Sequence, residues 1–169
     1  MVAHSADLVC IQEVGMRDGL QSAGQFVTTE DKVRLIDQLS KTGLSKIEVT
    51  SFVSPKAVPL LPDAEEVLAA INRQPSVTYS ALIPNRRGLD RALAVELDEV
   101  NLVMSVSEAH NLANLRMTCE QSIEQFREIC NNRGSLRVNG TLATAFGCPF
   151  HGEVKQSTVF EWAHRYLDA

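Results

Sequence analysis

The side chains best suited to chemistry in this sequence stand where apolar runs of the chain end. Arg17 and Asp18 follow the first apolar run, and Glu48 lies within the second, two residues before Thr50. In an extended strand Glu48 and Thr50 face the same side. A buried carboxylate is costly unless it is paired, and Arg17 is the candidate partner for Glu48. The residue types alone leave two interpretations open, a purely structural ion pair and a functional site.

Asp18 is a candidate ligand for a cation, although it equally fits a turn residue before Gly19. A hard cation takes about six oxygen or nitrogen ligands, so one carboxylate needs partners from elsewhere in the chain. His110 and His151 are the nearest loop candidates, and both are also well explained as solvated histidines. Cys148, in a Phe-Gly-Cys-Pro loop, is either a reactive thiol near the site or an inert, partly buried cysteine.

Composition and charge exclude several classes of partner. The 169 residues include 16 Lys plus Arg and 21 Asp plus Glu, for a net charge of -5, and no basic cluster is longer than Arg86-Arg87. A binder of nucleic acid needs a basic stripe, so nucleic acid is not an expected partner. No apolar run approaches the roughly 18 residues of a membrane span. Residues 1–7 show no secretory or transit pattern, and we therefore predict a cytoplasmic location.

The cysteine and glycine patterns argue against zinc, disulfide-rich and dinucleotide-binding proteins. The four cysteines include no Cys-x-x-Cys pair, which argues against a structural zinc site or a disulfide framework. The glycines near residue 19 lack the Gly-x-Gly-x-x-Gly spacing that cradles a dinucleotide phosphate.

Apolar, β-branched runs alternate with stretches of helical period, which indicates βα units around a parallel sheet. The predicted strands are Leu8 to Val14, Ser45 to Thr50, Thr78 to Ile83, Glu99 to Val106 and Leu136 to Ala143. The predicted helices are Thr29 to Thr42, Asp63 to Arg73, Arg87 to Leu97, Thr118 to Asn131 and Ser157 to Leu167. Five units fill an open flavodoxin-type sheet, or they form part of a (β/α)8 barrel, and the periodicity does not choose between these.

Several segments, in order along the chain, resemble the hydroxymethylglutaryl-CoA lyase family. They are EVGMRDGLQ (Glu13 to Gln21), IEVTSFVSPKAVPLLPDAEEVL (Ile47 to Leu68), ALIPNRRGLDRAL (Ala81 to Leu93), SEAHN (Ser107 to Asn111) and TAFGCPFHGEV (Thr144 to Val154). The resemblance extends from Val9 to the end of the chain. It implies a (β/α)8 TIM barrel, here incomplete with about five βα units, as a single partial domain over residues 1–169.

The resemblance also implies an activity and a set of site residues. Members cleave 3-hydroxy-3-methylglutaryl-CoA, an acyl-CoA of leucine degradation and ketone-body formation, into acetyl-CoA and acetoacetate. Asp18 would bind a divalent cation, Mg2+ or Mn2+. Arg17 would neutralise charge on the thioester oxygen and Glu48 would orient Arg17. The polar contacts expected in the mouth of the barrel are Gln21, Ser51 and Asn85.

This sequence departs from the family pattern in several places. Met16 stands where proline is usual, and Thr141 stands where a tyrosine is frequent. The chain has no His-x-His pair and stops three βα units short of eight. We therefore expect a fragment or a shortened gene product, with open sheet edges that favour self-association into a homo-oligomer. Alone it should bind Mn2+ weakly and turn over little substrate.

Three alternatives remain for the function. The first is a related lyase for another 3-hydroxyacyl-CoA, such as citramalyl-CoA. The second is an acyl-CoA condensing enzyme, although the SFVSP and FGCPF segments favour cleavage over condensation. The third is a non-catalytic fragment that acts as a structural or interaction module. Loss of metal binding on Asp18→Ala would argue against this third alternative.

Overall fold

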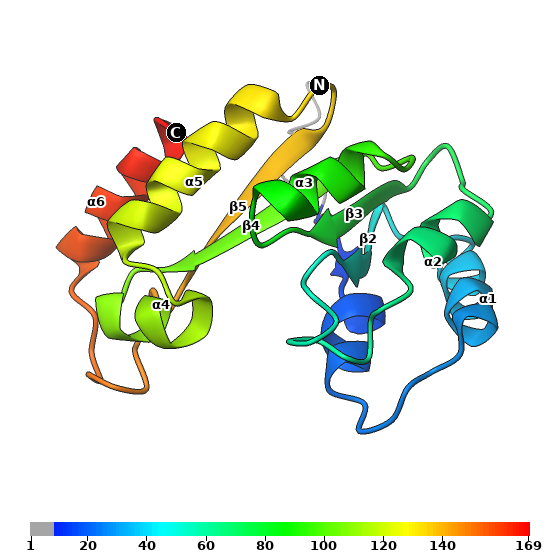
Figure 1. The fold of residues 1–169 in the computed structure, drawn as a ribbon, viewed down its shortest axis with the longest axis horizontal. Coiled ribbons are helices and arrows are strands. Elements are labelled where there is room, and N and C mark those ends of the chain that lie inside the picture. The colour runs from blue at the N-terminus through cyan, green and yellow to red at the C-terminus, as the bar shows by residue number, and fades with distance from the viewer. Residues whose placement is uncertain (1–8) are drawn as a thin grey trace, which may run out of the picture.

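The sheet consists of five parallel strands that pair in the order of the chain. The computed structural model describes residues 9–169, and each strand pairs with the next one along the sequence (Figure 1). The strands are β1 (Gln12–Glu13), β2 (Lys46–Ser51), β3 (Thr78–Leu82), β4 (Glu99–Ser105) and β5 (Arg137–Ala143). This order excludes the flavodoxin-type sheet, whose first strand lies between the second and third, and it matches successive strands of a (β/α)8 barrel.

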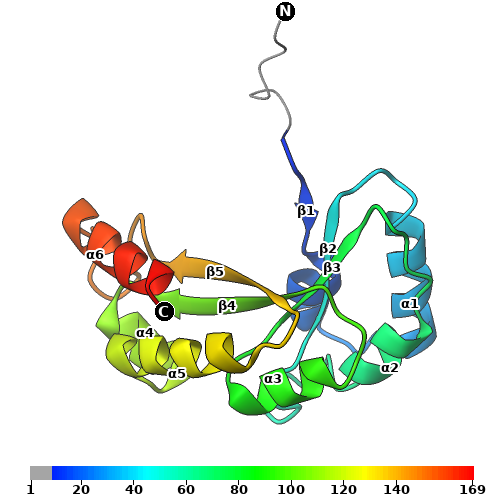
Figure 2. The same ribbon diagram turned by 90° about the horizontal axis from the view of Figure 1, so that it is seen from above.

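Helices connect the strands. They are the π-helix η2 (Gly15–Gly19), α1 (Thr29–Leu39), α2 (Ala64–Ala70), α3 (Arg86–Leu93), α4 (Glu108–Leu115), α5 (Cys119–Asn132) and α6 (Gln156–Leu167). Of these, α1, α2, α3 and α5 lie along the outer side of the curved sheet, and Figure 2 shows them following one another around this side. Within residues 9–169, no helix has the length and apolar character needed to cross a bilayer.

The observed elements follow the predicted ones closely, with two additions. The first strand, predicted from Leu8 to Val14, is shorter, and Leu8 lies outside the described residues. The π-helix η2 and helix α4 were not predicted, because both are short and carry no long apolar stripe. Capping defines α4 instead: the Ser107 hydroxyl accepts from the backbone N–H of His110, and Arg116 ends the helix in the left-handed conformation with φ 59°.

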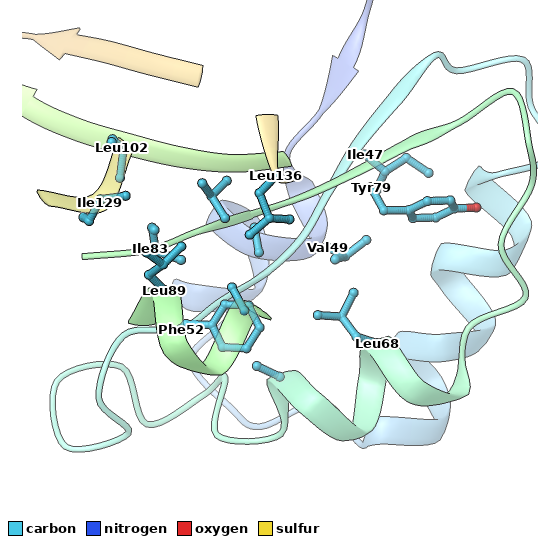
Figure 3. Packing of buried hydrophobic residues seen from close by; sticks show 14 of the residues in the cluster. Ile47, Val49, Phe52, Leu68, Tyr79, Ile83, Leu89, Leu102, Ile129 and Leu136 are labelled. Carbon is cyan, nitrogen blue, oxygen red and sulfur yellow. The ribbon is translucent and has the colours of Figure 1, made fainter. Parts of the chain in front are cut away.

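The apolar core lies between the sheet and its helices. Ile47 and Val49 of β2 face the helices and are almost fully buried. Figure 3 shows them beside Phe52, Leu68 and Tyr79. Because successive side chains of a strand point to opposite faces, Glu48 lies on the other side of β2, as the sequence predicts. The prediction for Thr50 is wrong, because a register shift between Glu48 and Thr50 pairs Thr50 with Ala81 of the apolar core.

That other face of the sheet is polar. Strands β2, β3, β4 and β5 place there the side chains of Glu48, Ser80, Asn101 and Asn139, which hydrogen-bond to one another. Of these, Glu48, Ser80 and Asn101 are buried, and Asn139 is half-buried. Polar groups at such depth are stable only when they are hydrogen-bonded, so this face is built as a network rather than as an apolar core.

Tyr166 of α6 contacts both the sheet and the neighbouring helix α5. The Tyr166 hydroxyl donates to the carbonyl of Leu102 over 2.8 Å, and the Tyr166 ring packs on Phe126 with centroids 5.1 Å apart. Burial raises the pKa of Tyr166 well above its usual value, which keeps this donor protonated. A Cβ atom built on Gly140 of β5 would overlap the Tyr166 ring.

We therefore expect Gly140→Ala to lower the free energy of unfolding by about 1–3 kcal/mol, the usual range for overpacking. The added methyl group must push the Tyr166 ring and α6 away from β5. Urea unfolding followed by circular dichroism measures the change. Gly19→Ala is the matched control, because a Cβ there would meet no atom within 4 Å. Equal stability of the two variants would show that α6 does not depend on this contact.

Candidate active site

A cavity of about 870 Å³ opens on the polar side of the sheet. Its lining includes side chains from η2 and the segment after it, from strands β2, β4 and β5, and from the β3–α3 loop. The polar members that matter for chemistry are Arg17, Gln21, Glu48, Asn85, Asn101 and Asn139. The volume lies within the usual range of small-molecule sites.

Arg17 is the only cation among the residues that line this cavity, and two carboxylates hold it. Its Nη2 donates to Glu48 Oε2 over 3.0 Å, and its Nη1 donates to Asp18 Oδ1 over 2.7 Å. The backbone of η2 fixes the chain here, since the N–H groups of Arg17 and Asp18 both donate to the carbonyl of Val14. Arg17 Nε is buried and has no hydrogen-bond partner within residues 9–169. The guanidinium therefore retains donor capacity for a further acceptor.

Glu48 is buried between two donors. Its side chain is 3% exposed, and its Oε1 accepts from Asn101 Nδ2 over 2.8 Å while its Oε2 accepts from Arg17. The ion pair that the sequence suggested is thus present, and it faces a cavity. A charge pair with a further hydrogen bond on its carboxylate meets the usual conditions for burial.

Asp18 differs from Glu48 in its exposure. Its side chain is 64% exposed, and it does not line the cavity. Over residues 9–169, no group of three or more His, Cys, Asp or Glu side chains could hold a metal ion. The described residues therefore do not fit a complete divalent-cation site, because a hard cation needs several oxygen or nitrogen ligands.

The three predicted polar contacts lie in different surroundings. Gln21 and Asn85 line the cavity, and Asn85 also caps α3 by accepting from the backbone N–H of Gly88 over 3.0 Å. Ser51 is 1% exposed and does not line the cavity. Its hydroxyl accepts from the backbone N–H of Val53 over 3.2 Å, which holds the turn after β2.

The loop candidates lie at the ends of β4 and β5. His110 Nδ1 is 2.6 Å from the Ser105 hydroxyl, whereas His151 is exposed. Cys148 is buried, and its Sγ is 3.0 Å from the Ser107 hydroxyl. Burial opposes ionisation of this thiol, but hydrogen bonds from Ser107 and from two backbone N–H groups lower its pKa overall. The Ser107 hydroxyl and two backbone N–H groups therefore stabilise the Cys148 thiolate, and no cationic neighbour is needed.

Two cavity residues were not anticipated, Asn101 and Asn139. They are direct partners across β4 and β5, and Asn139 Nδ2 donates to Asn101 Oδ1 over 3.1 Å. Their signal in the sequence was the alternation of polar with apolar residues along β4 and β5 on the same face as Glu48.

Fold and site together define a partial (β/α)8 barrel whose polar face carries a guanidinium–carboxylate pair in a ligand-sized cavity. Catalytic residues of this architecture lie at the carboxyl ends of the barrel strands, and Arg17 follows the first strand there. The HMGL-like family model matches residues 9–169. The chain belongs to the HMGL-like family.

Named relatives support this membership. The chain is 45% identical over 148 residues to hydroxymethylglutaryl-CoA lyase of Bacillus subtilis, covering 86% of this chain and 50% of that protein. It is 42% identical over 155 residues to the mitochondrial hydroxymethylglutaryl-CoA lyase of Gallus gallus, covering 90% and 52%. The chain therefore spans about half the length of these relatives.

A solved structure agrees in fold. An HMG-CoA lyase from Acinetobacter baumannii, in complex with coenzyme A and 3-methylmalate, superposes with a TM-score of 0.94 at 49% identity. The match covers 99% of this chain and 55% of that one. The predicted incomplete barrel is thus confirmed, and the alternative of an open doubly wound sheet is wrong.

Proposed function

We propose that the protein contributes to cleavage of 3-hydroxy-3-methylglutaryl-CoA into acetyl-CoA and acetoacetate, a step of leucine degradation. The single observation that carries the proposal is Arg17, which lines the cavity and donates from Nη2 to the buried Glu48 carboxylate. Family membership and relatives named as lyases support the choice of reaction.

The chemistry needs a stabilised oxyanion. In the reaction the tertiary alcohol loses its proton, the bond between C2 and C3 breaks, and its electron pair passes into the thioester as an enolate. The enolate then takes up a proton to give acetyl-CoA, and the other product is the ketone acetoacetate. A guanidinium has a planar set of donors that suits a developing oxyanion, and Arg17 would supply it. Glu48 would keep that guanidinium in place without touching the substrate.

Asp18 is the residue that we propose as one ligand of a divalent cation, Mg2+ or Mn2+. Its exposed carboxylate accepts from Arg17, which lines the cavity. The remaining ligands would have to come from outside residues 9–169, because the described residues form no cluster of ligands. When bound, such a cation polarises substrate oxygens.

The cytoplasmic location stays a prediction, and named relatives include both mitochondrial and cytoplasmic forms.

A related substrate is the second candidate. Thr141 lines the cavity at a position where the family resemblance leads one to expect a larger tyrosine, so the lining of this cavity departs from the family pattern. The Acinetobacter baumannii lyase holds 3-methylmalate with coenzyme A, so a similar protein accepts another branched dicarboxylate. A 3-hydroxyacyl-CoA such as citramalyl-CoA therefore belongs in the substrate screen.

A chimera tests the proposed reaction directly. Residues 9–169 replace the matched half of the Bacillus subtilis lyase, and cleavage is followed by mass spectrometry with Mn2+ or Mg2+ present. We expect acetyl-CoA and acetoacetate from the chimera, and little product from the 169-residue chain alone, whose described residues lack a cation site. A folded chimera that cleaves neither 3-hydroxy-3-methylglutaryl-CoA nor citramalyl-CoA would overturn the proposal.

A further inference from the structure

Asn101 occupies a central position in the polar network under the cavity. Its side chain belongs to β4, is 4% exposed and makes three contacts. Asn101 Nδ2 lies 2.8 Å from Glu48 Oε1 and 3.4 Å from the Ser80 hydroxyl. Asn101 Oδ1 lies 3.1 Å from Asn139 Nδ2. The amide therefore links β5, β4, β3 and β2 across the sheet.

The chemistry of the partners fixes the direction of these hydrogen bonds. An ionised carboxylate only accepts, so the NH2 group of Asn101 must face Glu48. The carbonyl oxygen of Asn101 then faces Asn139, which must present its own NH2 group. Donation thus runs from β5 through β4 to β2, and Arg17 donates to Glu48 from the opposite side. Only one orientation of each side-chain amide satisfies every hydrogen bond in this series.

The local backbone of β2 is irregular at the same place. The register between β2 and β3 shifts between Glu48 and Thr50, which is the mark of a β-bulge. Glu48 is the last residue before this shift and is paired with Ser80, so the ladder fixes the face on which its side chain lies but not the torsions that aim the carboxylate. A side-chain partner is needed to fix these torsions, and Asn101 is in contact with Glu48 Oε1.

Arg17 has a competing arrangement. Besides Glu48 it donates to Asp18, whose side chain is 64% exposed, whereas Glu48 is 3% exposed. If the Glu48 carboxylate turns away, the remaining ion pair draws the guanidinium outward to solvent. Holding Glu48 therefore decides whether the guanidinium points into the cavity.

We propose that Asn101, supported by Asn139, is a positioning residue that locks the Glu48 carboxylate and thereby aims the Arg17 guanidinium into the cavity. The inference rests on the proposed function insofar as Arg17 is the oxyanion donor. Its geometric part concerns only this chain and can be measured without substrate.

The first test follows Arg17 by NMR in the 169-residue chain. In the unmodified protein we expect restricted rotation and slow solvent exchange of the Arg17 Nη protons. Asn101→Ala should speed that exchange about tenfold or more. The lost hydrogen bond to the charged Glu48 contributes enough free energy to change an equilibrium constant by about that factor. Asn131→Ala is the matched control, because Asn131 is exposed on α5. Unchanged Arg17 signals in Asn101→Ala would overturn the inference.

A second variant separates positioning from packing. Asn101→Asp keeps the shape and still accepts from Asn139, but it places a second carboxyl group against Glu48. At low pH the protonated group can donate to Glu48 as the amide does, so Arg17 should stay restricted. As pH rises the group ionises, the two carboxylates repel, and the restriction should be lost. The other charged groups on this face and at its rim are Arg17, Asp18, Lys46, Glu99 and Arg137.

The outcomes distinguish this inference from the proposed function. A pH-dependent Arg17 signal in Asn101→Asp, absent in the unmodified protein and in Asn131→Asp, supports positioning. A pH-independent signal overturns it, because a packing role would not respond to pH. Titration of the same chains with 3-hydroxy-3-methylglutaryl-CoA reads out the function separately. Absence of binding to the unmodified chain, together with the Arg17 response, would leave positioning intact and count against the substrate.

Discussion

Arg17→Lys is expected to lower kcat/KM of the chimera by about 10²–10³-fold, the usual effect of removing a donor to a developing oxyanion. An ammonium keeps the charge but lacks the planar fork that lets Arg17 bind Glu48 and Asp18 while leaving Nε free. The loss should appear mainly in kcat, because the oxyanion forms only during the reaction. Steady-state kinetics with 3-hydroxy-3-methylglutaryl-CoA measure both constants.

The matched control for this substitution is Arg34→Lys. Arg34 lies on α1 with its side chain 68% exposed and pairs with Asp31 in the same helix. It should leave both constants unchanged, since exposed ion pairs contribute little. A comparable loss in both variants would indicate a general effect of the substitution, and full activity of Arg17→Lys would remove Arg17 from the mechanism.

The sequence predicted the frame of the site through simple periodicity. The alternation in β2 placed Glu48 opposite Ile47 and Val49, and the cost of a buried charge then pointed to Arg17 as its partner. Both inferences depend only on the spacing of residues along one strand and on their charges, and both can be read from a single sequence. Periodicity could not decide between a barrel and an open sheet, because it is the same in both. Only the strand order or the family resemblance decides between these two folds.

The missed features depend on contacts between strands. Asn101 and Asn139 acquire a role only when β4 and β5 pair in register beside Glu48, and that register is not visible in either segment alone. Ser51 is buried where the strand ends: its hydroxyl accepts from Val53 in the turn after β2, and the residue does not line the cavity. Its role as a substrate contact stays a prediction, and so do the roles of Gln21 and Asn85.

Lys32→Met is expected to lower the free energy of unfolding by about 3–5 kcal/mol, the cost of removing one partner of a buried ion pair. Lys32 on α1 is 2% exposed, and its Nζ lies 2.6 Å from Asp63 Oδ1 and donates to the carbonyl of Leu60 over 3.0 Å. Methionine fills a similar volume but leaves Asp63 with only the Thr29 hydroxyl as a partner.

The effect should reach the cavity as well as the stability. Asp63 directly precedes α2 and ends the loop that follows β2, and Val53 and Val58 of that loop line the cavity. When the ion pair is broken, this wall loses its anchor to α1. We therefore expect the backbone amides of residues 53–63 to exchange hydrogen faster in Lys32→Met, as measured by mass spectrometry.

Two further variants decide whether the unpaired charge is the cause. Lys41→Met removes an exposed lysine just after α1 and should leave stability unchanged. The double variant Lys32→Met/Asp63→Asn removes both charges, and it should recover most of the lost stability because no uncompensated carboxylate remains. If the double variant is as unstable as Lys32→Met, then the other contacts of Lys32, such as that of its Nζ atom with the Phe26 ring, hold this wall of the cavity.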